Sequence, residues 1–352
     1  MERDCLEPRK LSTFMNDSKI DQTSISEPLR LERIFHEKIW GGRVLEDIPG
    51  IELDIAGPVG ETWELVDRED YVSTISGGGY EGRSLRGLMM SAGEALLGET
   101  QVTKSGHFPL MIKYLCATKP LSVQVHPDDL AAGQLGVGDE GKHECWYVLD
   151  AAPGSLVYLG LKEGVEASEF AEVAGTAGVV DLLQPWEVRA GDFVNVPGGT
   201  LHSIGEGITL VEVQNNSDVT FRLYDWDRIG LDGAPRELHV DQALISVDWE
   251  SRPVGPVQPE MESCGGANRC SVLIDNDRFK VSLFELSSHE DFESGGRAVA
   301  NVLIEGRARI SVGDEFWSME GGDTWLFPAS LSEYRLRPEG ERARILRVES
   351  RS

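Results

Sequence analysis

The sequence predicts a mainly β fold made of two jelly-roll units, with a few helices inserted in the N-terminal half. Most of the 352-residue chain consists of short runs of aromatic and β-branched residues separated by glycines, the pattern of strands joined by tight turns. Two stretches, 191–204 (GDFVNVPGGTLHSI) and 322–335 (GDTWLFPASLSEYR), share a Gly-Asp turn, a short apolar strand and a proline five residues after the aspartate. This repeat is the reason for expecting two units of the same kind.

The predicted boundaries follow the composition along the chain. Residues 1–28 are polar and lack sustained periodicity, so we expect a flexible tail. The first β unit is predicted over 29–254 and the second over 269–352. Between them, residues 255–268 are rich in glycine and proline and are expected to form a linker.

Two stretches of the first unit are predicted to be helical. Residues 84–98 (SLRGLMMSAGEALLG) carry apolar side chains at helical spacing and end on glycine. A second helical patch lies at 166–183 and is interrupted by Gly175 and Gly178. Nearly everything else in this unit has the pattern of strands.

The composition excludes several classes of partner. A formal net charge of -27 repels nucleic acids and anionic membranes, so neither is expected to bind. The five cysteines are odd in number and form no CxxC pair, which argues against a disulfide framework or a thiolate zinc site and fits a reducing cytoplasm. We find no secretory signal and no apolar run of roughly 18 residues. We therefore expect a cytoplasmic protein, either a monomer or a weak homodimer.

A row of polar residues interrupts an otherwise apolar strand in KYLCATKPLSVQVH, which runs from Lys113 to His126. Side chains of a strand alternate between its faces, so Ser122, Gln124 and His126 share one face. Such a row is unfavourable to bury without partners and therefore needs solvent or something to bind. We interpret it as half of a metal site.

Two later segments add donors to this row. In GKHECWYVLD, alternation places Lys142, Glu144 and Trp146 on one face of a strand. In VPGGTLHSIGEG, a glycine-rich turn leads into His202, and glycine lets a backbone approach a site closely. The candidate ligands are two imidazoles, one carboxylate and one amide oxygen, from His126, His202, Glu144 and Gln124. Two histidines and one carboxylate suit zinc with an open position, and the same set accommodates Fe(II) or Mn(II).

Each of these residues also has an ordinary structural explanation. A lone histidine beside an apolar strand is more often a hydrogen-bonded core residue than a ligand. Glu144 alone would more often face solvent, and Gln124 could satisfy a neighbouring backbone group. The common phase of the polar residues favours the metal site. His107, His143 and His239 are expected to be surface or structural residues.

The second unit is expected to lack metal ligands. Counted from the Gly-Asp turn, the position of His202 in the first repeat is Glu333 in the second, and no Gln-x-His row precedes it. We therefore predict a structural role for the second unit.

A further polar row follows in NNSDVTFRLYDWDR, where Asp218, Thr220, Arg222 and Tyr224 fall on one face by alternation. An edge strand with a solvent face would show the same pattern. However, Lys113, Lys142 and Arg222 are cations on strands expected to adjoin one cavity, in a protein with few cations. An anionic ligand such as a phosphate would explain them.

Four segments resemble the motifs of type I mannose-6-phosphate isomerases in their short bacterial form, within the cupin superfamily: PLMIKYLCATKPLSVQVHPDD, GKHECWYVLD, PGGTLHSIGEG and FRLYDWDR. The resemblance extends from EKIWGG (37–42) through DWDR (225–228) and on towards the C-terminus, leaving only the tail uncovered. The run from Gly191 to His202 also matches the second cupin motif, although Glu206 stands where that motif usually has asparagine. Gln-x-His likewise replaces the common His-x-His. Both departures are typical of the isomerase family.

The resemblance implies two cupin-type barrels and a zinc enzyme that interconverts mannose 6-phosphate and fructose 6-phosphate, with its catalytic domain at 29–254. It implies one zinc ion per chain, with ligands at Gln124, His126, Glu144 and His202. It places five residues in the substrate pocket, with Arg222 at the position regarded as catalytic: Lys113, Ser122, Lys142, Asp218 and Arg222. Lys113 and Ser122 suit binding of phosphate or sugar hydroxyls better than proton transfer.

The proton shuttle and two competing functions stay open at this point. Isomerisation through an enediol needs an acid/base group, and a zinc-bound water, Asp218 or Lys142 could serve, the lysine only if burial favours its neutral form. A catalytically silent cupin that senses a phosphosugar is the alternative function. An iron oxygenase would use the same histidines and carboxylate, but its chemistry would leave the cations without a task.

Overall fold

The structure is a computed structural model that describes residues 25–351. The predicted tail, 1–28, lies outside the described residues except for 25–28. Within these four residues Ile25 is buried, and Ser330 Oγ donates a hydrogen bond of 2.7 Å to its carbonyl oxygen. The folded part of the chain therefore begins before residue 29.

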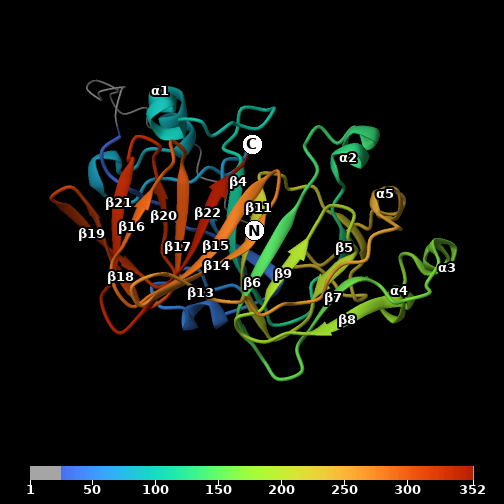
Figure 1. Ribbon diagram of the computed structural model, residues 1–352. Coiled ribbons are helices and arrows are strands. Elements are labelled where there is room, and N and C mark those ends of the chain that lie inside the picture. The colour runs from blue at the N-terminus through green and yellow to red at the C-terminus, as the bar shows by residue number, and fades with distance from the viewer. Residues whose placement is uncertain (1–24, 352) are drawn as a thin grey trace, which may run out of the picture.

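The first unit consists of two facing β-sheets (Figure 1). The six-stranded sheet has, in spatial order, β2 (Ile34–Gly42), β3 (Val59–Leu65), β4 (Leu110–Ala117), β11 (Ile208–Asn215), β6 (Glu144–Ala151) and β9 (Phe193–Val196). The five-stranded sheet has β12 (Phe221–Tyr224), β5 (Val123–Val125), β10 (His202–Ile204), β7 (Leu156–Leu161) and β8 (Leu183–Glu187).

The second unit repeats this arrangement with a seven-stranded and a four-stranded sheet. The larger sheet has β1 (Leu29–Arg30), β20 (Thr324–Phe327), β17 (Val299–Glu305), β22 (Ala343–Ser350), β15 (Phe279–Leu286), β14 (Asn268–Asp275) and β13 (Glu262–Gly265). The smaller sheet has β16 (Glu290–Glu293), β21 (Glu333–Pro338), β18 (Arg307–Val312) and β19 (Glu315–Glu320). The predicted mainly β fold is confirmed.

Three hydrophobic cores separate the four sheets, and the largest lies between the six-stranded and the seven-stranded sheet. All eight residues of strand β4 are buried, because its two faces pack in different cores. Ile112 and Tyr114 face the second unit. Lys113 and Leu115 alternate with them and face the interior of the first unit. The chain passes from β4 to β5 by crossing between the two sheets of the first unit, so the run from Lys113 to His126 forms two strands.

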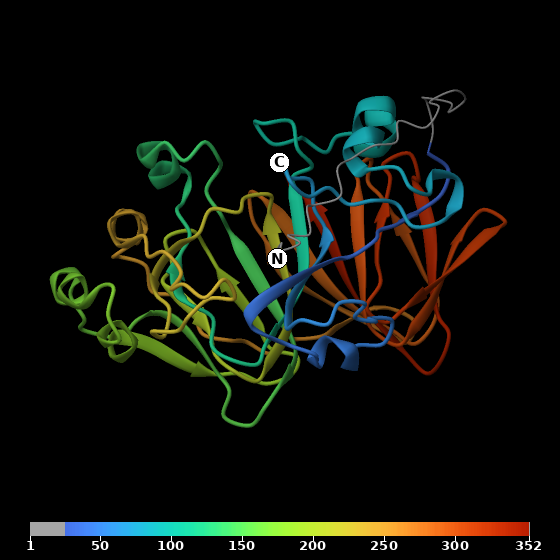
Figure 2. The same ribbon diagram turned by 180° about the vertical axis from the view of Figure 1, so that it is seen from behind.

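The N-terminal segment ties the two units together (Figure 2). Strand β1 pairs with β20 of the second unit, and the chain then crosses to pair β2 with β3 of the first. Within the predicted linker, residues 262–265 form strand β13, which pairs with β14. Val257 forms an isolated bridge with Phe193. The linker prediction therefore needs correction, since part of it extends the second unit's sheet.

The predicted helices are confirmed as α1 (Leu85–Leu97) and the pair α3 (Ala167–Val173) and α4 (Gly178–Leu182). Ser84 caps α1 by accepting a hydrogen bond of 3.1 Å from the backbone N–H of Gly87. Two short helices were not predicted, α2 (Asp129–Leu135) and α5 (Val240–Ser246). Single 3-10 turns occur at η1 (Val44–Asp47) and η2 (Gly78–Tyr80). No helix between residues 25 and 351 has both the length and the apolar character needed to cross a membrane.

The helices lie in two places (Figure 1). Helix α1 covers one end of the second unit, where Ala329 and Ser330 donate backbone hydrogen bonds to its last turn. Helices α3, α4 and α5 pack on the outer face of the five-stranded sheet through Phe170, Val179 and Ala243. This outer layer leaves the inner face of that sheet directed at the six-stranded sheet.

The sequence repeat corresponds to a repeated turn. Asp192 accepts a hydrogen bond of 2.8 Å from the backbone N–H of Arg189, and Asp323 accepts one of 2.9 Å from that of Glu320. The equivalent strands then diverge in content. Glu333 is exposed in the second unit, whereas its neighbour Tyr334 points inwards and stacks on Phe327 at 4.0 Å between ring centroids. Aromatic packing therefore fills this part of the second unit.

Candidate metal centre and adjoining cavity

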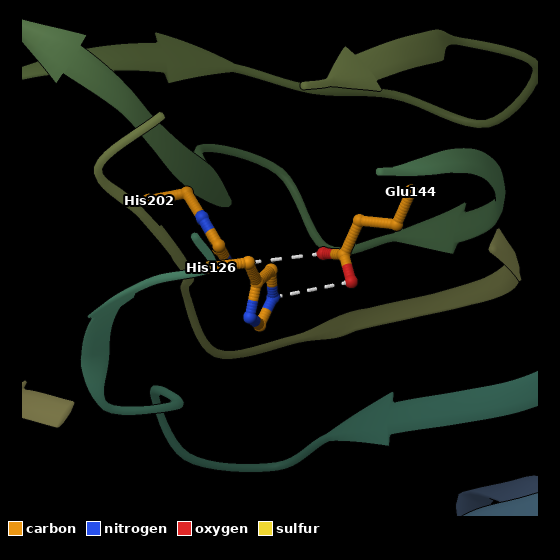
Figure 3. Close-up of side chains that lie close together, drawn as sticks. All are labelled: His126, Glu144 and His202. Carbon is orange, nitrogen blue, oxygen red and sulfur yellow. Dashed lines mark ion pairs between the residues drawn. The ribbon is translucent and has the colours of Figure 1, made fainter. Parts of the chain in front are cut away.

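Three side chains meet between the sheets of the first unit (Figure 3). The imidazole Nε2 of His126 is 3.3 Å from Glu144 Oε2, and that of His202 is 3.7 Å from Glu144 Oε1. The ligand atoms of the three residues all lie within 4.8 Å of one another. All three side chains are buried. Among residues 25–351, this is the one group of three or more histidine, cysteine and carboxylate side chains so placed.

Strand pairing and a glycine turn bring the two histidines together. His202 begins β10 and pairs with Gln124 on β5, two residues before His126. The backbone N–H of Gly199 donates a hydrogen bond of 2.7 Å to the carbonyl oxygen of His126. A Cβ on Gly198 would lie 2.9 Å from the backbone of Asp128. The Gly-Gly turn is therefore needed for this close approach. Glu144 reaches the same point from β6 in the facing sheet.

Both imidazoles are held in the tautomer that leaves Nε2 without a proton. His126 Nδ1 donates to the carbonyl oxygen of Val219, and His202 Nδ1 donates to that of Thr200, each at 2.9 Å. A carbonyl oxygen can only accept, so the proton of the neutral ring lies on Nδ1. The lone pairs of both Nε2 atoms are then directed at the side where Glu144 lies, as in histidines that bind metals.

The protonation states of the three groups also suit a metal. Burial, reinforced by the charge of Lys142, lowers the pKa of His126 to about 4. Burial likewise lowers the pKa of His202. Burial alone would raise the pKa of Glu144, but the charge of Lys142, whose ammonium is 2.7 Å from Glu144 Oε2, outweighs it and holds that pKa well below its usual value. At neutral pH the site offers two neutral imidazoles and one carboxylate, the forms that bind metals.

Gln124 lies beside this group and is fixed by Ser122. Its Nε2 is 3.1 Å from His202 Nε2, and its Oε1 accepts a hydrogen bond of 3.0 Å from Ser122 Oγ. The amide nitrogen, rather than the oxygen, therefore faces the centre. A half-turn of the amide about its last bond would exchange the two atoms and present the oxygen as a fourth donor.

The residues present fit a divalent metal ion. His126 Nε2 is buried and makes no hydrogen bond, which is unfavourable for a polar atom unless a ligand occupies the position. Two imidazoles and one carboxylate, with Gln124 in reach, are a donor set for zinc with an open coordination position, or for Fe(II) or Mn(II).

A polar cavity of about 460 Å³ adjoins the centre. Its lining includes one candidate ligand and four of the other residues singled out from the sequence: Gln124, Lys113, Lys142, Asp218 and Arg222. Ser122 is buried and does not line this cavity, so it acts on it through Gln124.

Glu212 is a cavity residue that the sequence patterns did not single out. Its Oε1 is 2.8 Å from the ammonium of Lys113 and 3.9 Å from that of Lys142, and all three side chains are almost completely buried. Together with Glu144 they form an alternating row of positive and negative charges that ends at the candidate metal centre. The only sign of this residue in the sequence was a single carboxylate within the otherwise apolar segment ITLVEVQN.

The aromatic wall of the cavity was also missed. His36 packs against Trp63 at 4.0 Å and Tyr71 at 4.8 Å between ring centroids, and all three residues line the cavity. Burial, followed by the charge of Lys38, lowers the pKa of His36 to about 4, so the ring is neutral at pH 7. Single aromatic residues in strands gave no reason to expect a shared surface.

The last predicted polar row needs one correction. Asp218, Thr220 and Arg222 line the cavity, but Tyr224 packs with the helices outside the five-stranded sheet. The register of β12 against β5 shifts between Arg222 and Tyr224, and such a bulge reverses the direction of the following side chains. His239, which was expected to be a surface or structural residue, accepts a hydrogen bond of 3.3 Å from the backbone N–H of Arg222.

Fold and site together define a mainly β, cupin-like protein with a buried candidate metal centre beside a cation-rich cavity. A family model described as "Phosphomannose isomerase type I, catalytic domain" matches residues 29–146. The mannose-6-phosphate isomerase of Streptococcus mutans is 34% identical over 311 residues, which cover 88% of this chain and 95% of that protein. The chain belongs to the mannose-6-phosphate isomerase family.

Solved structures of the family share the fold. The mannose 6-phosphate isomerase from Bacillus subtilis superposes with a TM-score of 0.82 at 28% identity, covering 91% of this chain and 99% of that one. A zinc-bound mannose 6-phosphate isomerase superposes with a TM-score of 0.74 at 19% identity, covering 92% of this chain and 100% of that one. The similarity to the zinc-bound structure is a similarity of fold alone.

Proposed function

We propose that this protein is a zinc-dependent isomerase that interconverts mannose 6-phosphate and fructose 6-phosphate. The observation that carries the proposal is the buried group of His126, Glu144 and His202, which adjoins a cavity lined by lysines and arginines. A phosphosugar needs cations for its phosphate, and an aldose–ketose isomerisation needs charge stabilisation at the carbonyl end. Membership of the isomerase family supports the same conclusion.

His126, Glu144 and His202 would hold the ion, with Gln124 as a fourth ligand after its amide turns. Bound there, zinc would act as a Lewis acid that stabilises negative charge developing on the sugar oxygens. The neutral imidazoles and the ionised carboxylate need no change of protonation at neutral pH to bind it. One such group occurs in the described chain, so one ion per chain is expected.

The reaction moves one proton between C2 and C1 of the open-chain sugar through an enediol. Asp218 is the proposed general base, because its carboxylate lines the cavity and takes part in no hydrogen bond or ion pair among residues 25–351. Lys142 is held 2.7 Å from Glu144 and supplies a fixed positive charge and hydrogen-bond donors. Arg222 offers a guanidinium whose Nε is buried without a partner, and it would stabilise negative charge on the sugar.

Substrate binding is proposed for Lys113 and, indirectly, for Ser122. Lys113 Nζ uses one donor on Glu212 and lies 5.6 Å from the ring centre of Trp63, which leaves further donors for a sugar hydroxyl. Ser122 fixes the amide of Gln124 and so determines what that side chain presents.

A coupled assay with mannose 6-phosphate tests the proposal. Wild-type protein loaded with zinc should form fructose 6-phosphate, lose activity on dialysis against a chelator, and regain it with zinc. Tight zinc binding and phosphosugar binding without turnover would instead establish the sensor function. Restoration by Fe(II) together with oxygen consumption would support an oxygenase.

A further inference from the structure

An ionic cluster stands at the turn after β12 and has no role in the chemistry described above. The carboxylate of Asp225 accepts hydrogen bonds from two arginines. Arg236 Nε donates to Oδ2 at 2.8 Å and its Nη2 to Oδ1, while Arg228 Nη2 donates to Oδ1 at 2.8 Å. Asp225 is buried, so this is a built cluster and not a chance surface contact.

Arg236 reaches from this cluster to the cavity. It is one of the lining residues, and its guanidinium lies over the indole of Trp40 at 4.9 Å from the ring centre. Asp225 occupies Nε and Nη2, and no hydrogen bond within residues 25–351 uses Nη1. The side chain is therefore rigid and charged, and both N–H donors of Nη1 are unused among residues 25–351.

Strand pairing locates Arg236 relative to the candidate metal centre. His202, Gln124 and Arg222 are in register on the neighbouring strands β10, β5 and β12. Two strand spacings separate the backbones of His202 and Arg222, roughly 10 Å. Arg222 Nη1 donates a hydrogen bond of 2.8 Å to the carbonyl oxygen of Glu237, the residue after Arg236, and the charge of Arg236, after burial, lowers the pKa of Arg222. Arg236 therefore lies at the Arg222 end of this row, away from His202.

This end of the cavity has an excess of positive charge. Lys38 pairs with Glu61, Arg228 and Arg236 share Asp225, and Arg222 forms no ion pair among residues 25–351. Arg222 and Arg236 both line the cavity, so an anionic group such as a phosphate would find cations here that the carboxylates do not fully neutralise. Neighbouring guanidinium groups repel each other unless an anion lies between them.

We infer that Arg236 binds the phosphate of the substrate, and that Asp225 and Trp40 hold its guanidinium in place. The inference rests on the proposed function. In that substrate the phosphate is at the opposite end of the sugar from the carbonyl that would meet the metal, and Arg236 lies at the end of the cavity away from His202. Arg236 contacts the phosphate through Nη1, and Asp225 acts as a positioning residue.

The backbone that follows Asp225 is also held in a fixed conformation. The two following residues, Trp226 and Asp227, adopt left-handed conformations with φ of 58° and 50°, which are unfavourable for residues other than glycine. Trp226 Nε1 donates to the carbonyl oxygen of Leu121, and Tyr224 donates to Asp227, so the turn is fixed by side chains. A short hairpin closed by the bridge between Ile229 and Pro235 then returns the chain to Arg236.

The test compares Arg236→Gln and Arg236→Lys with a control, Arg189→Gln, a surface arginine that is 78% exposed. Zinc-loaded proteins are titrated with mannose 6-phosphate by calorimetry, assayed for turnover, and inhibited with inorganic phosphate. Arg236→Gln should raise the KM, the Kd and the inhibition constant of phosphate roughly 10- to 100-fold, the range of one charge-assisted contact. Its kcat and zinc content should stay at the wild-type level. Arg236→Lys should fall between, because a lysine keeps the charge but not the fork.

Wild-type affinity for both phosphate ligands in Arg236→Gln would overturn the inference, as would a loss confined to kcat. Removing Arg236 leaves Asp225 paired with Arg228, so this variant should fold. A second variant, Asp225→Asn, tests the positioning role of Asp225. It should raise the KM for mannose 6-phosphate without changing kcat, and Asp225→Glu should restore part of the affinity for mannose 6-phosphate. If wild-type protein binds mannose 6-phosphate but does not isomerise it, the proposed function fails while the calorimetric comparison still decides the role of Arg236.

Discussion

Replacing Glu212 by glutamine should expose how the charged row beside the metal centre is stabilised. Glu212 and Lys113 form an ion pair of 2.8 Å with side chains 6% exposed, and the ammonium of Lys142 is 3.9 Å away. The variant Glu212→Gln keeps the shape but leaves Lys113 without its nearest counter-charge. Breaking a buried pair costs about 3–5 kcal/mol. We expect the lower end of that range, since Glu61 and Asp218 still attract Lys113.

The pH dependence gives this prediction a sign. Burial alone would lower the pKa of Lys113, but Glu212, Glu61 and Asp218 outweigh it and raise the pKa above its ordinary value. A raised lysine pKa stabilises the folded state fully below the unfolded pKa of about 10.4, and this contribution is lost as pH rises through the folded pKa. Glu212→Gln should therefore lose stability at neutral pH and begin its alkaline unfolding at lower pH than wild type.

Urea unfolding followed by circular dichroism, at pH 7 and along a series above pH 9, measures both effects. The matched control is the double variant Lys113→Met/Glu212→Leu, which removes both charges and should recover most of the lost free energy, because apolar replacements of buried pairs are often neutral. Equal stability of Glu212→Gln and wild type, or a double variant no more stable than the single one, would show that Glu212 does not stabilise the folded state through the charge of Lys113.

Three further outcomes follow from individual contacts. Arg222→Ala should keep its zinc but lose turnover by roughly 100-fold or more, as for loss of a donor to a developing negative charge; near wild-type kcat in the coupled assay would assign β12 a structural role. Tyr114→Phe removes a buried hydroxyl that has no partner, so its free energy of unfolding should equal or exceed that of wild type by up to about 1 kcal/mol. Burial raises the pKa of Tyr114 well above its usual value, so the free energy of unfolding of the wild type should fall above about pH 10. The variant should lose less stability in this range, and the same loss in both proteins would contradict this. Gly41→Ala would place a Cβ 2.5 Å from the backbone of Pro58 and should lower the free energy of unfolding by about 1–3 kcal/mol. The control Gly133→Ala, on the open face of α2, should be neutral or stabilising. Similar urea midpoints for the two variants would argue against the close β2–β3 contact.

The local part of the site was accessible from the sequence because strand alternation is a strict rule. Period-two alternation placed Gln124 and His126 on one face, and the Gly-Gly turn before His202 marked a close backbone approach. The structure brings the two histidines together with Glu144, and Gln124 Nε2 is 3.1 Å from His202 Nε2. Alternation failed where a bulge interrupts it, and Tyr224 therefore points away from Arg222.

The rest of the site depended on contacts between strands that are distant in sequence. Glu212 lies in a strand whose eight residues are all buried, and the pattern alone could not say that two lysines from other strands would meet it. The ion pairs of Asp225 likewise depend on a hairpin that returns Arg236 eleven residues later. Cross-strand partners are set by register and by sheet order, which a single sequence does not state.

The stacking of the two units was also outside what the sequence could predict. Apart from Lys113, strand β4 is apolar on both faces, which indicates burial on both sides but does not identify the sheet that covers each face. Helices α2 and α5 have seven residues each, too few for a helical period to stand out. The predicted linker contained β13 because a short strand at a sheet edge needs little apolar character.

We propose that His126, Glu144 and His202 hold one zinc ion on which the isomerase activity depends. The most direct measurement is the zinc content of purified, zinc-loaded protein, wild type beside His202→Ala, with circular dichroism as the check of folding. We expect one zinc per wild-type chain, and we expect the folded variant to lose most of its zinc together with its activity. Full zinc content in His202→Ala, or none in wild type, would contradict it.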